Sequence, residues 1–403
     1  MRATLNTAAP VPPGVAGIAA VGFYLPPYRI TAEEYRRAVG RFEAPGILEK
    51  SVPGFDEDIV TMAVAAGERA LDAAGLSSLG LLAFATSGTA EGSTVAQALG
   101  LEDARAKEIG GSRDAGVQAL SAALTETDAR REASLVIVSD APRADPSSAE
   151  EHALGSAAVA VLVTAKGGVV REKDAGPRAD HRADDVLSRV GDAGAASPFL
   201  PFLQLLHRAK KEQRVALGDA ATFIVTAKSA GDANVARALE GRTAITYEQY
   251  LGFRRYKPPP GGTEYSQGAY VSLPAYRAEA KARYRLIGDR CTKCGRLFFP
   301  PRESCLSCGG RDWEDAALRR TGKVYAHTVI GRGAAPSEFL EQQALAGEYA
   351  TAVVELDDGP RITAMLTDVD PVKVRIGMPV RMVFRRIYTQ EGVTRYGFKF
   401  APG

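Results

Sequence analysis

The sequence is poor in the residues that most often carry chemistry, because its 403 residues include only four cysteines, four histidines and one tryptophan. It also lacks any apolar run long enough to span a bilayer, which excludes a membrane-spanning helix. Residues 1–15 are polar and rich in proline, without the apolar core of a secretory signal. We therefore expect a cytoplasmic protein that begins with a flexible arm over residues 1–15.

The sequence has no strong excess of charge of one sign. The net charge is +2, and 45% hydrophobic and 24% charged residues are typical of ordinary globular proteins. Residues 281–403 hold 20 Lys and Arg against 14 Asp and Glu, whereas the first 280 residues hold 30 against 34. The C-terminal part is mildly basic, which leaves a phosphate-rich small molecule and nucleic acid open as partners.

The four cysteines form two Cys-x-x-Cys pairs separated by ten residues. The first pair is Cys291 and Cys294, and the second is Cys305 and Cys308. A glycine follows each pair, so the backbone can turn tightly and direct its amides at sulfur. Four thiolates suit a closed, tetrahedral and structural zinc site. If all four bind metal, no thiol remains for catalysis.

Two other uses of these cysteines are disfavoured. A pair of disulfides would fit a secreted domain, but the sequence shows no secretory signal and the spacing is that of paired metal-binding turns. A single redox-active Cys-x-x-Cys pair does not explain why a second pair follows at zinc-ribbon spacing.

The pattern of apolar residues divides the chain into several regions. Short buried strands alternate with helical segments over residues 16–245, which predicts a layered α/β domain with a mostly parallel sheet. Residues 246–280 contain a Pro-Pro-Pro-Gly-Gly run and predict a linker, whose tyrosines and arginines indicate that it packs on something. A zinc ribbon over 281–312 precedes a predicted small barrel of the OB type over 313–403. The five strands expected in this barrel are residues 322–330, 350–356, 361–367, 380–386 and 395–400.

The C-terminal part, over residues 277–403, resembles the zinc-ribbon and OB-fold family found beside thiolases and acyl-CoA synthases. The residues that carry the resemblance are 291–302, 305–308, 322–325, 353–357 and 374–380. The resemblance implies a domain that bridges or completes an acyl-CoA enzyme.

Residues 16–245 look like the hydroxymethylglutaryl-CoA synthase and ketoacyl-synthase III branch of the thiolase fold. The residues that carry this resemblance are 22–26, 49–53, 56–58, 155–158 and 191–198. The implied fold is a thiolase-like layered α/β structure, here truncated because residues 166–189 are too few to hold elements that the family has in that place.

The family's catalytic cysteine and asparagine are both replaced. The cysteine opens a helix in the family, and residues 110–116 occupy that place here with Ser112 or Arg113 at the aligned position. The asparagine belongs to a Gly-Asn-x-Gly turn, and Asp192 stands there instead. The resemblance therefore implies a degenerate site, in which we assign no catalytic residue.

The family's acidic and histidine positions are not matched either. The position of the synthase glutamate falls near Gly88, with Glu91 only close by in sequence. The family histidine follows elements that this chain has no room for, so its role is not transferred to His181.

Isolated residue types give weaker signals. Ser112 is more simply a turn or helix-capping residue than a nucleophile, because no motif supplies a base and an orienting group. His152, His207 and His327 are more simply surface or packing residues than catalytic bases, because no partner motif surrounds any of them.

The preferred hypothesis is a catalytically silent subunit of an acyl-CoA thiolase or acyltransferase complex. Its thiolase-like half would pair with an active thiolase or synthase subunit in a hetero-oligomer, and its zinc-ribbon and OB half would help position the coenzyme A thioester. By resemblance, one setting is the thiolysis of an aromatic 3-oxoacyl-CoA such as benzoylsuccinyl-CoA, carried out by a two-component thiolase.

Two alternatives remain open. One is an autonomous condensing or acyl-transfer enzyme of the hydroxymethylglutaryl-CoA synthase type that uses Ser112 with Glu91, Asp192 or His152. The other is a nucleic-acid-binding zinc-ribbon and OB protein, which the modest positive charge disfavours.

Overall fold

The computed structural model describes residues 15–90, 92–172, 185–256, 276, 278–390 and 393–403. The chain divides into two compact units, Met1–Tyr256 and Lys257–Gly403. No helix in the described segments is both long and apolar enough to cross a membrane.

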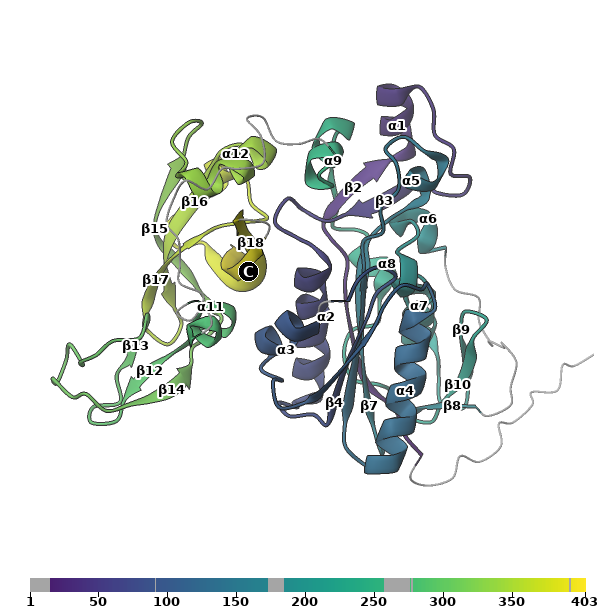
Figure 1. Ribbon diagram of the computed structural model, residues 1–403, viewed down its shortest axis with the longest axis horizontal. Coiled ribbons are helices and arrows are strands. Elements are labelled where there is room, and N and C mark those ends of the chain that lie inside the picture. Colours follow the sequence, from purple (N-terminus) through teal and green to yellow (C-terminus); the bar gives the residue numbers. More distant parts are fainter. Residues whose placement is uncertain (1–14, 91, 173–184, 257–275, 277, 391–392) are drawn as a thin grey trace, which may run out of the picture. The chain divides into compact units, whose positions relative to one another are not determined.

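The first unit contains eleven described strands and nine described α-helices (Figure 1). The strands are β1 (Gly17–Tyr24), β2 (Tyr28–Thr31), β3 (Glu49–Val52), β4 (Leu81–Ala85), β5 (Arg105–Ile109), β6 (Ser134–Asp140), β7 (Ala157–Thr164), β8 (Val169–Arg171), β9 (Arg214–Leu217), β10 (Ala221–Val225) and β11 (Thr243–Ala244). The helices are α1 (Ala32–Val39), α2 (Ile59–Ala74), α3 (Gly92–Leu99), α4 (Ala115–Arg130), α5 (Ala149–Ala153), α6 (Leu187–Val190), α7 (Phe199–Arg208), α8 (Val235–Ala238) and α9 (Tyr247–Phe253).

The main sheet of this unit has the strand order β5-β4-β6-β7-β1-β8-β10-β9. Helices α2 and α3 lie on one of its faces, and α4 and α7 lie on the other (Figure 1). The core between α4, α7 and the sheet is built from fully buried aliphatic and aromatic side chains, such as Val138, Phe199 and Leu203. The layered α/β fold expected from the sequence is confirmed.

The expectation of a mostly parallel sheet is wrong. Only β4 pairs in parallel with its two neighbours, β5 and β6, and the other adjacent pairs of this sheet are antiparallel. Alternating strands and helices suggested parallel crossovers, but the link from β6 to β7 holds only the short helix α5. Strands β9 and β10 are joined by a tight turn, which forces an antiparallel pair.

Helix α2 shows why small residues recur on one face of this unit. Asp58 caps it by accepting hydrogen bonds from the amides of Val60 and Thr61, each at 3.0 Å. A Cβ atom at Gly22 of β1 would lie 2.4 Å from the carbonyl oxygen of Ala66. Glycine and alanine therefore let the helix and the strand approach closely.

A small sheet, β11-β2-β3, packs with α1, α5 and α9 around a fully buried ion pair. Lys50 Nζ lies 2.5 Å from Glu151 Oε1, and both side chains are at most 1% exposed. Tyr35 donates a hydrogen bond to the same oxygen at 2.6 Å, and Tyr250 of α9 also donates to it. Burial lowers the pKa of Lys50 to about 8, against the opposing effect of the Glu151 carboxylate.

Helix α9 lies within the range that the sequence suggested as a linker. Its residues Tyr250 and Phe253 are buried with Ile30 and Tyr35 in the core of the small sheet, so this part of the range belongs to the first unit. The tyrosines of this stretch pack as expected, although residues 257–275 lie outside the described residues.

The second unit contains a zinc-ribbon sheet and a five-stranded barrel. Its elements are α11 (Ala280–Arg285), β12 (Ile287–Cys291), β13 (Leu297–Phe298), β14 (Trp313–Ala317), β15 (Thr321–Ile330), α12 (Leu340–Ala346), β16 (Tyr349–Leu356), β17 (Arg361–Met365), β18 (Pro379–Gln390) and β19 (Val393–Pro402). The barrel strands follow the order β17-β16-β15-β18-β19, and a bridge between Leu366 and Phe400 brings the two ends together. The predicted OB-type barrel is confirmed.

The buried Lys50–Glu151 pair generates a stability prediction. Lys50→Met should lower the free energy of unfolding by about 3–5 kcal/mol, because it leaves the Glu151 carboxylate buried without its cation. Adding Glu151→Gln should recover part of this loss, because the amide oxygen still accepts from the tyrosines. Urea unfolding followed by circular dichroism measures both, with Arg130→Gln at an exposed pair (Arg130 with Glu126) as a control expected to cost about 0.5 kcal/mol or less. Equal losses in Lys50→Met and Arg130→Gln would contradict the prediction.

Candidate functional site

The four cysteine sulfurs of the second unit converge on one point. Cys291 ends β12, Cys294 lies in the turn that follows, and Cys305 and Cys308 lie in the loop before β14. All four sulfur atoms lie within 4.8 Å of one another. The Cys291–Cys308 and Cys294–Cys305 sulfur pairs are each 3.6 Å apart. Tetrahedral zinc with Zn–S bonds of about 2.3 Å places sulfurs about 3.8 Å apart, so the four thiols fit this metal.

Backbone amides help stabilise thiolate at this site. The amide of Ser307 donates to Cys305 Sγ at 3.4 Å. Desolvation opposes ionisation of Cys305, but the amides of Ser307 and Cys308 together with the neighbouring thiols lower its pKa to about 6. Gly295 and Gly309 adopt left-handed φ angles of 72° and 71° after the two cysteine pairs, as expected from the sequence. Zinc bound here would hold the two turns together and leave no ligand position open.

In the first unit, the structure brings together two of the positions where the synthase-like motif is altered. Arg113, just before α4, forms an ion pair with Asp192, which lies in the loop between α6 and α7. The Asp192 carboxylate raises the pKa of Arg113, mainly through their hydrogen bond. The other Asp192 oxygen accepts from the amide of Gly194 at 3.0 Å and from the hydroxyl of Ser197 at 2.8 Å. Both carboxylate oxygens of Asp192 are thus bonded to structural partners.

A buried carboxylate fixes the loops around this ion pair. Asp140, at the end of β6, accepts from the amides of Ser87 and Ala195 at 2.8 and 2.9 Å. These amides belong to the loops after β4 and after α6. Gly194 has a φ of 55°, and a Cβ atom there would lie 2.3 Å from Asp140 Oδ2. The close approach explains the glycine beside Asp192.

Ser112 and His152 do not form a catalytic pair. The hydroxyl of Ser112 accepts from the amide of Asp114 at 3.1 Å, which closes the turn before α4. His152 is fully buried between Phe42 and Tyr35, and its Nδ1 accepts from the amide of Glu43 at 2.9 Å. Burial lowers the pKa of His152, which favours a neutral packing residue.

The remaining candidates are dispersed or outside the described residues. His207 is exposed on α7, and His327 is exposed on β15. Glu91 and His181 lie outside the part of the chain that the structure describes.

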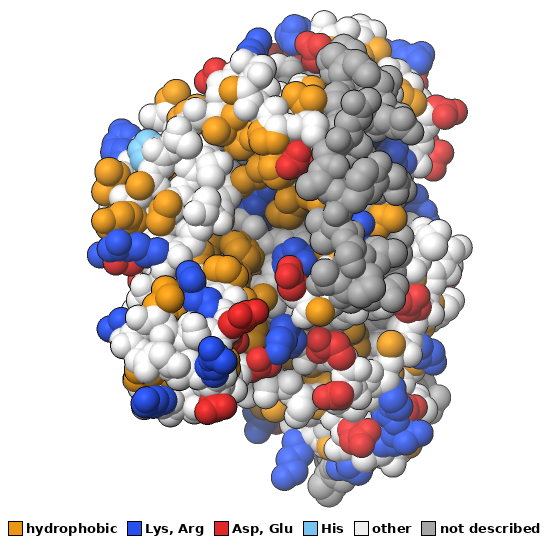
Figure 2. Space-filling model, turned by 60° about the vertical axis from the view of Figure 1, so that its left-hand side comes forward, with side chains coloured by type: hydrophobic (Ala, Val, Ile, Leu, Met, Phe, Trp, Pro, Cys, Tyr) orange, Lys and Arg blue, Asp and Glu red, His pale blue; other side chains and the backbone are white. Residues whose placement is uncertain are grey.

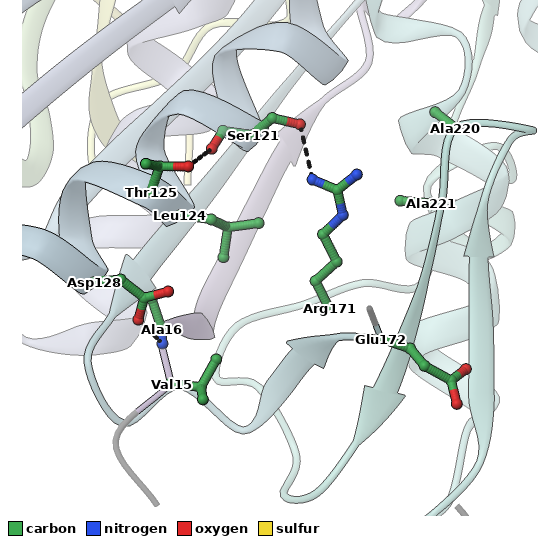
Figure 3. Close-up of a pocket in the computed structure, with 10 residues that line it drawn as sticks. All are labelled: Val15, Ala16, Ser121, Leu124, Thr125, Asp128, Arg171, Glu172, Ala220 and Ala221. Atoms are coloured by element: carbon green, nitrogen blue, oxygen red, sulfur yellow. Dashed lines mark hydrogen bonds between the residues drawn. The ribbon is translucent and has the colours of Figure 1, made fainter. Parts of the chain in front are cut away.

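A cavity of about 460 Å³ opens along the C-terminal half of α4 (Figure 3). Ser121, Thr125 and Asp128 of α4 face Arg171 of β8 across it, and Arg171 donates a hydrogen bond to the Ser121 hydroxyl at 3.3 Å. Arg113, which pairs with Asp192, lies at the other end of α4, just before its first residue, Ala115. The cavity is therefore separate from the positions that correspond to the synthase site.

Family models match the second unit. The model described as the ChsH2 rubredoxin-like zinc ribbon domain matches residues 278–314, and that of the ChsH2 C-terminal OB-fold domain matches residues 315–385. A DUF35 domain-containing scaffold protein of Methanocaldococcus jannaschii is 45% identical over 125 residues, which are 30% of this chain and 84% of that protein. The chain belongs to the DUF35 family. This membership rests on the zinc ribbon and the barrel, which we call the DUF35 region. The resemblance of this region to the zinc-ribbon and OB-fold family, expected from the sequence, is confirmed.

Another relative carries the name of an acyl-CoA enzyme. The benzoylsuccinyl-CoA thiolase subunit BbsA of Thauera aromatica is 31% identical over 124 residues, which are 30% of this chain and 79% of that subunit.

The first unit is similar in fold to a solved structure, that of MvaS in complex with 3-hydroxy-3-methylglutaryl coenzyme A. This similarity concerns the fold only. It covers 62% of this chain and 97% of that chain, with a TM-score of 0.50 and 18% identity. The thiolase-like fold expected beside the DUF35 region is thereby confirmed.

The pairing of two residues could not be predicted from the sequence. Asp192 and Arg113, the latter as an alternative to Ser112, were expected at altered positions, but 79 residues separate them and no motif links them. The opposite charges of the two replacements were the only available signal.

The cysteine cluster generates a metal-binding prediction. Cys294→Ser should lower zinc content from about one ion per chain to well below that value, because one of four thiolate ligands is lost. The thermal transition of the DUF35 region should fall at the same time. Metal analysis of the purified chain and calorimetry measure both effects, with Ser307→Ala in the same loop as the matched control. Full zinc occupancy in Cys294→Ser would contradict the assignment of this cysteine as a ligand.

Proposed function

We propose that the chain is a catalytically silent subunit that pairs with an active thiolase-fold subunit and helps position its acyl-CoA substrate. The observation that carries the proposal is the Arg113–Asp192 ion pair. It joins Asp192, which stands where the thiolase-like family has its asparagine, to Arg113, which with Ser112 is one of the two residues that align with the family's cysteine nucleophile. A guanidinium stays protonated at neutral pH and is therefore not a nucleophile.

The cysteine content supports the same conclusion. Acyl transfer through a covalent intermediate needs an activated nucleophile and a positioned base. The chain has no cysteine outside the four that converge in the DUF35 region. Among the described residues, no carboxylate or imidazole forms a hydrogen bond with the Ser112 hydroxyl, so Ser112 lacks the activation that a serine nucleophile requires.

The relatives support dependence on a partner. The names of two similar proteins describe a scaffold protein and a thiolase subunit. We infer that the DUF35 region of this chain likewise works within a hetero-oligomer that handles coenzyme A thioesters, and that zinc bound by Cys291, Cys294, Cys305 and Cys308 maintains its shape.

An open sheet edge offers the pairing surface for the thiolase-like half. Strand β5 ends the main sheet and pairs only with β4 in the described part of the chain. Arg105 N donates to Gly80 O at 3.1 Å, so the alternation along a strand directs the amides of Ala106 and Glu108 away from β4. Side chains 106–108 are exposed. Such an edge can receive a strand from a second subunit.

The surface charge gives less support to nucleic acid as the partner. On the face of the molecule drawn in Figure 2, Lys and Arg side chains are interspersed with Asp and Glu, and hydrophobic side chains gather between them. A groove for single-stranded nucleic acid is instead strongly basic and lined with aromatic side chains for stacking.

The open edge generates a prediction about assembly. Ala106→Pro removes an amide that faces away from β4 and therefore keeps the bonds between β4 and β5 intact. It should weaken binding to the thiolase-fold partner that co-purifies from the native host by about tenfold or more, as measured by analytical ultracentrifugation or surface plasmon resonance. The melting temperature of the isolated chain should stay within about 3 °C.

The matched control is Ala106→Ser, which changes the side chain and keeps the amide. It should bind the partner as the unaltered chain does. Unchanged partner binding in a well-folded Ala106→Pro variant would exclude β5 as the pairing edge.

A further inference from the structure

Two arginines of the DUF35 region converge on one tyrosine ring. Arg283 of α11 places its Cζ atom 3.5 Å from the centroid of the Tyr276 ring, and Arg395 of β19 places its Cζ atom 4.4 Å from it. The ring is held in place at both ends. Arg283 Nη2 donates to the Tyr276 carbonyl oxygen at 2.6 Å, and the amide of Tyr396 donates to the Tyr276 hydroxyl at 3.2 Å. Both positively charged guanidinium groups therefore lie against the same tyrosine ring.

Arg395 is buried, and no counter-ion accompanies it in the described part of the chain. The residue is 8% exposed, and its Nε atom is buried without a hydrogen-bond partner. No carboxylate among the described residues forms an ion pair with it. Arg283 shows the same feature at its own Nε atom.

A second buried arginine of the same barrel shows the usual solution. Arg385 of β18 is 2% exposed, and its Nη2 donates to the Asp368 carboxylate at 2.9 Å. Removing a guanidinium from water is costly, and an opposite charge normally compensates for it. The face of an aromatic ring compensates only in part. As far as the structure describes the chain, the environment of Arg283 and Arg395 therefore lacks an anion that the environment of Arg385 supplies.

The described groups around the two arginines do not provide that anion. Tyr388 pairs with Arg395 across β18 and β19, and both arginines lower its pKa while burial, the largest effect, raises it. Glu338 also acts on Tyr388, but it forms no ion pair with either arginine in the described structure. Tyr284 completes the surroundings, with its hydroxyl 3.2 Å from that of Tyr276.

We propose that Arg283 and Arg395 form a binding site for a phosphate group of the coenzyme A thioester. Guanidinium groups bind phosphate through two parallel N–H donors, and they release water more readily than an ammonium group does. Two arginines against one ring, with no carboxylate partner among the described residues, match a phosphate monoester or diphosphate in charge and in the N–H donors that they offer. The choice of coenzyme A as the source rests on the proposed function, whereas the oxyanion site rests on the arginines alone.

The experiment measures ligand binding to the complete, zinc-loaded chain in the absence of any partner. Isothermal titration calorimetry compares coenzyme A with pantetheine, which lacks all phosphate groups, with inorganic phosphate, and with a single-stranded oligodeoxynucleotide. Coenzyme A should bind, and pantetheine should bind at least about tenfold more weakly, because the charge-assisted hydrogen bonds are missing.

Arg395→Met and Arg283→Met should each weaken binding of coenzyme A by about tenfold or more and leave pantetheine unaffected. Methionine keeps the apolar part of the arginine side chain, so both variants should fold, as circular dichroism and zinc content will show. The matched control is Arg381→Met on β18, where the arginine is exposed, and its affinity should change less than about twofold.

Three results would overturn the proposal. The first is no binding of coenzyme A by the unaltered chain at about 1 mM, and the second is equal affinity in Arg395→Met. The third is tighter binding of the oligonucleotide than of coenzyme A, with loss in Arg395→Met, which would replace the coenzyme by nucleic acid. Inorganic phosphate binding as tightly as coenzyme A would overturn the assignment of the source. Partner binding is measured separately through Ala106→Pro, so failure of this site and failure of the proposed function are distinguishable.

Discussion

The crowding of four thiol groups at one point is the constraint on which the DUF35 region depends. Thiolates whose sulfurs all lie within 4.8 Å repel one another unless a cation lies between them, so this part of the chain is expected to fold with its metal. The ribbon sheet β13-β12-β14 is short, and its strand β13 has only two residues. A bound ion would supply the cross-links that so small a sheet cannot obtain from apolar burial. The same constraint acts on the rest of the protein, because it leaves no cysteine for chemistry in the thiolase-like half.

The thiolase-like half retains the architecture of a synthase while its altered positions serve structural roles. The layered sheet and the helices on both faces are present, and the loops that meet beside α4 are held by the Asp140 carboxylate. Within this frame, Arg113 and Asp192 neutralise each other. In the proposed silent subunit, this framework would present surfaces, such as the β5 edge, to an active partner.

Local features of this protein could be predicted from sequence, and features that depend on distant pairing could not. The cysteine pairs and their glycines lie within eighteen residues of one another, so their spacing alone indicates a metal site. The five barrel strands alternate apolar and polar side chains between turns, and β15 to β19 appear where that pattern predicts them. Strand β5 was missed because its sequence, Arg-Ala-Lys-Glu-Ile, has no apolar run and its residues are mostly exposed. The direction of the strands was predicted wrongly, since periodicity does not record which neighbour a strand selects.

The side-chain pairs that matter most to the sites join residues far apart in the sequence and therefore could not be predicted from it. Lys50 and Glu151 are 101 residues apart, and Arg113 and Asp192 are 79 apart. Tyr276 and Arg395 come from opposite ends of the DUF35 region. Each pair is fixed by the topology of the sheets, and nothing in the local sequence of either member identifies its partner.

Acyl transfer by the isolated chain is the most direct test of catalytic silence. The purified, zinc-loaded chain would be assayed for thiolysis and for condensation of acyl-CoA thioesters, alone and together with the thiolase-fold protein that co-purifies from its native host. We predict no turnover by the chain alone and full activity only in the complex. Turnover by the chain alone, abolished in Ser112→Ala, would contradict the silent-subunit conclusion and make Ser112 the nucleophile of an autonomous enzyme.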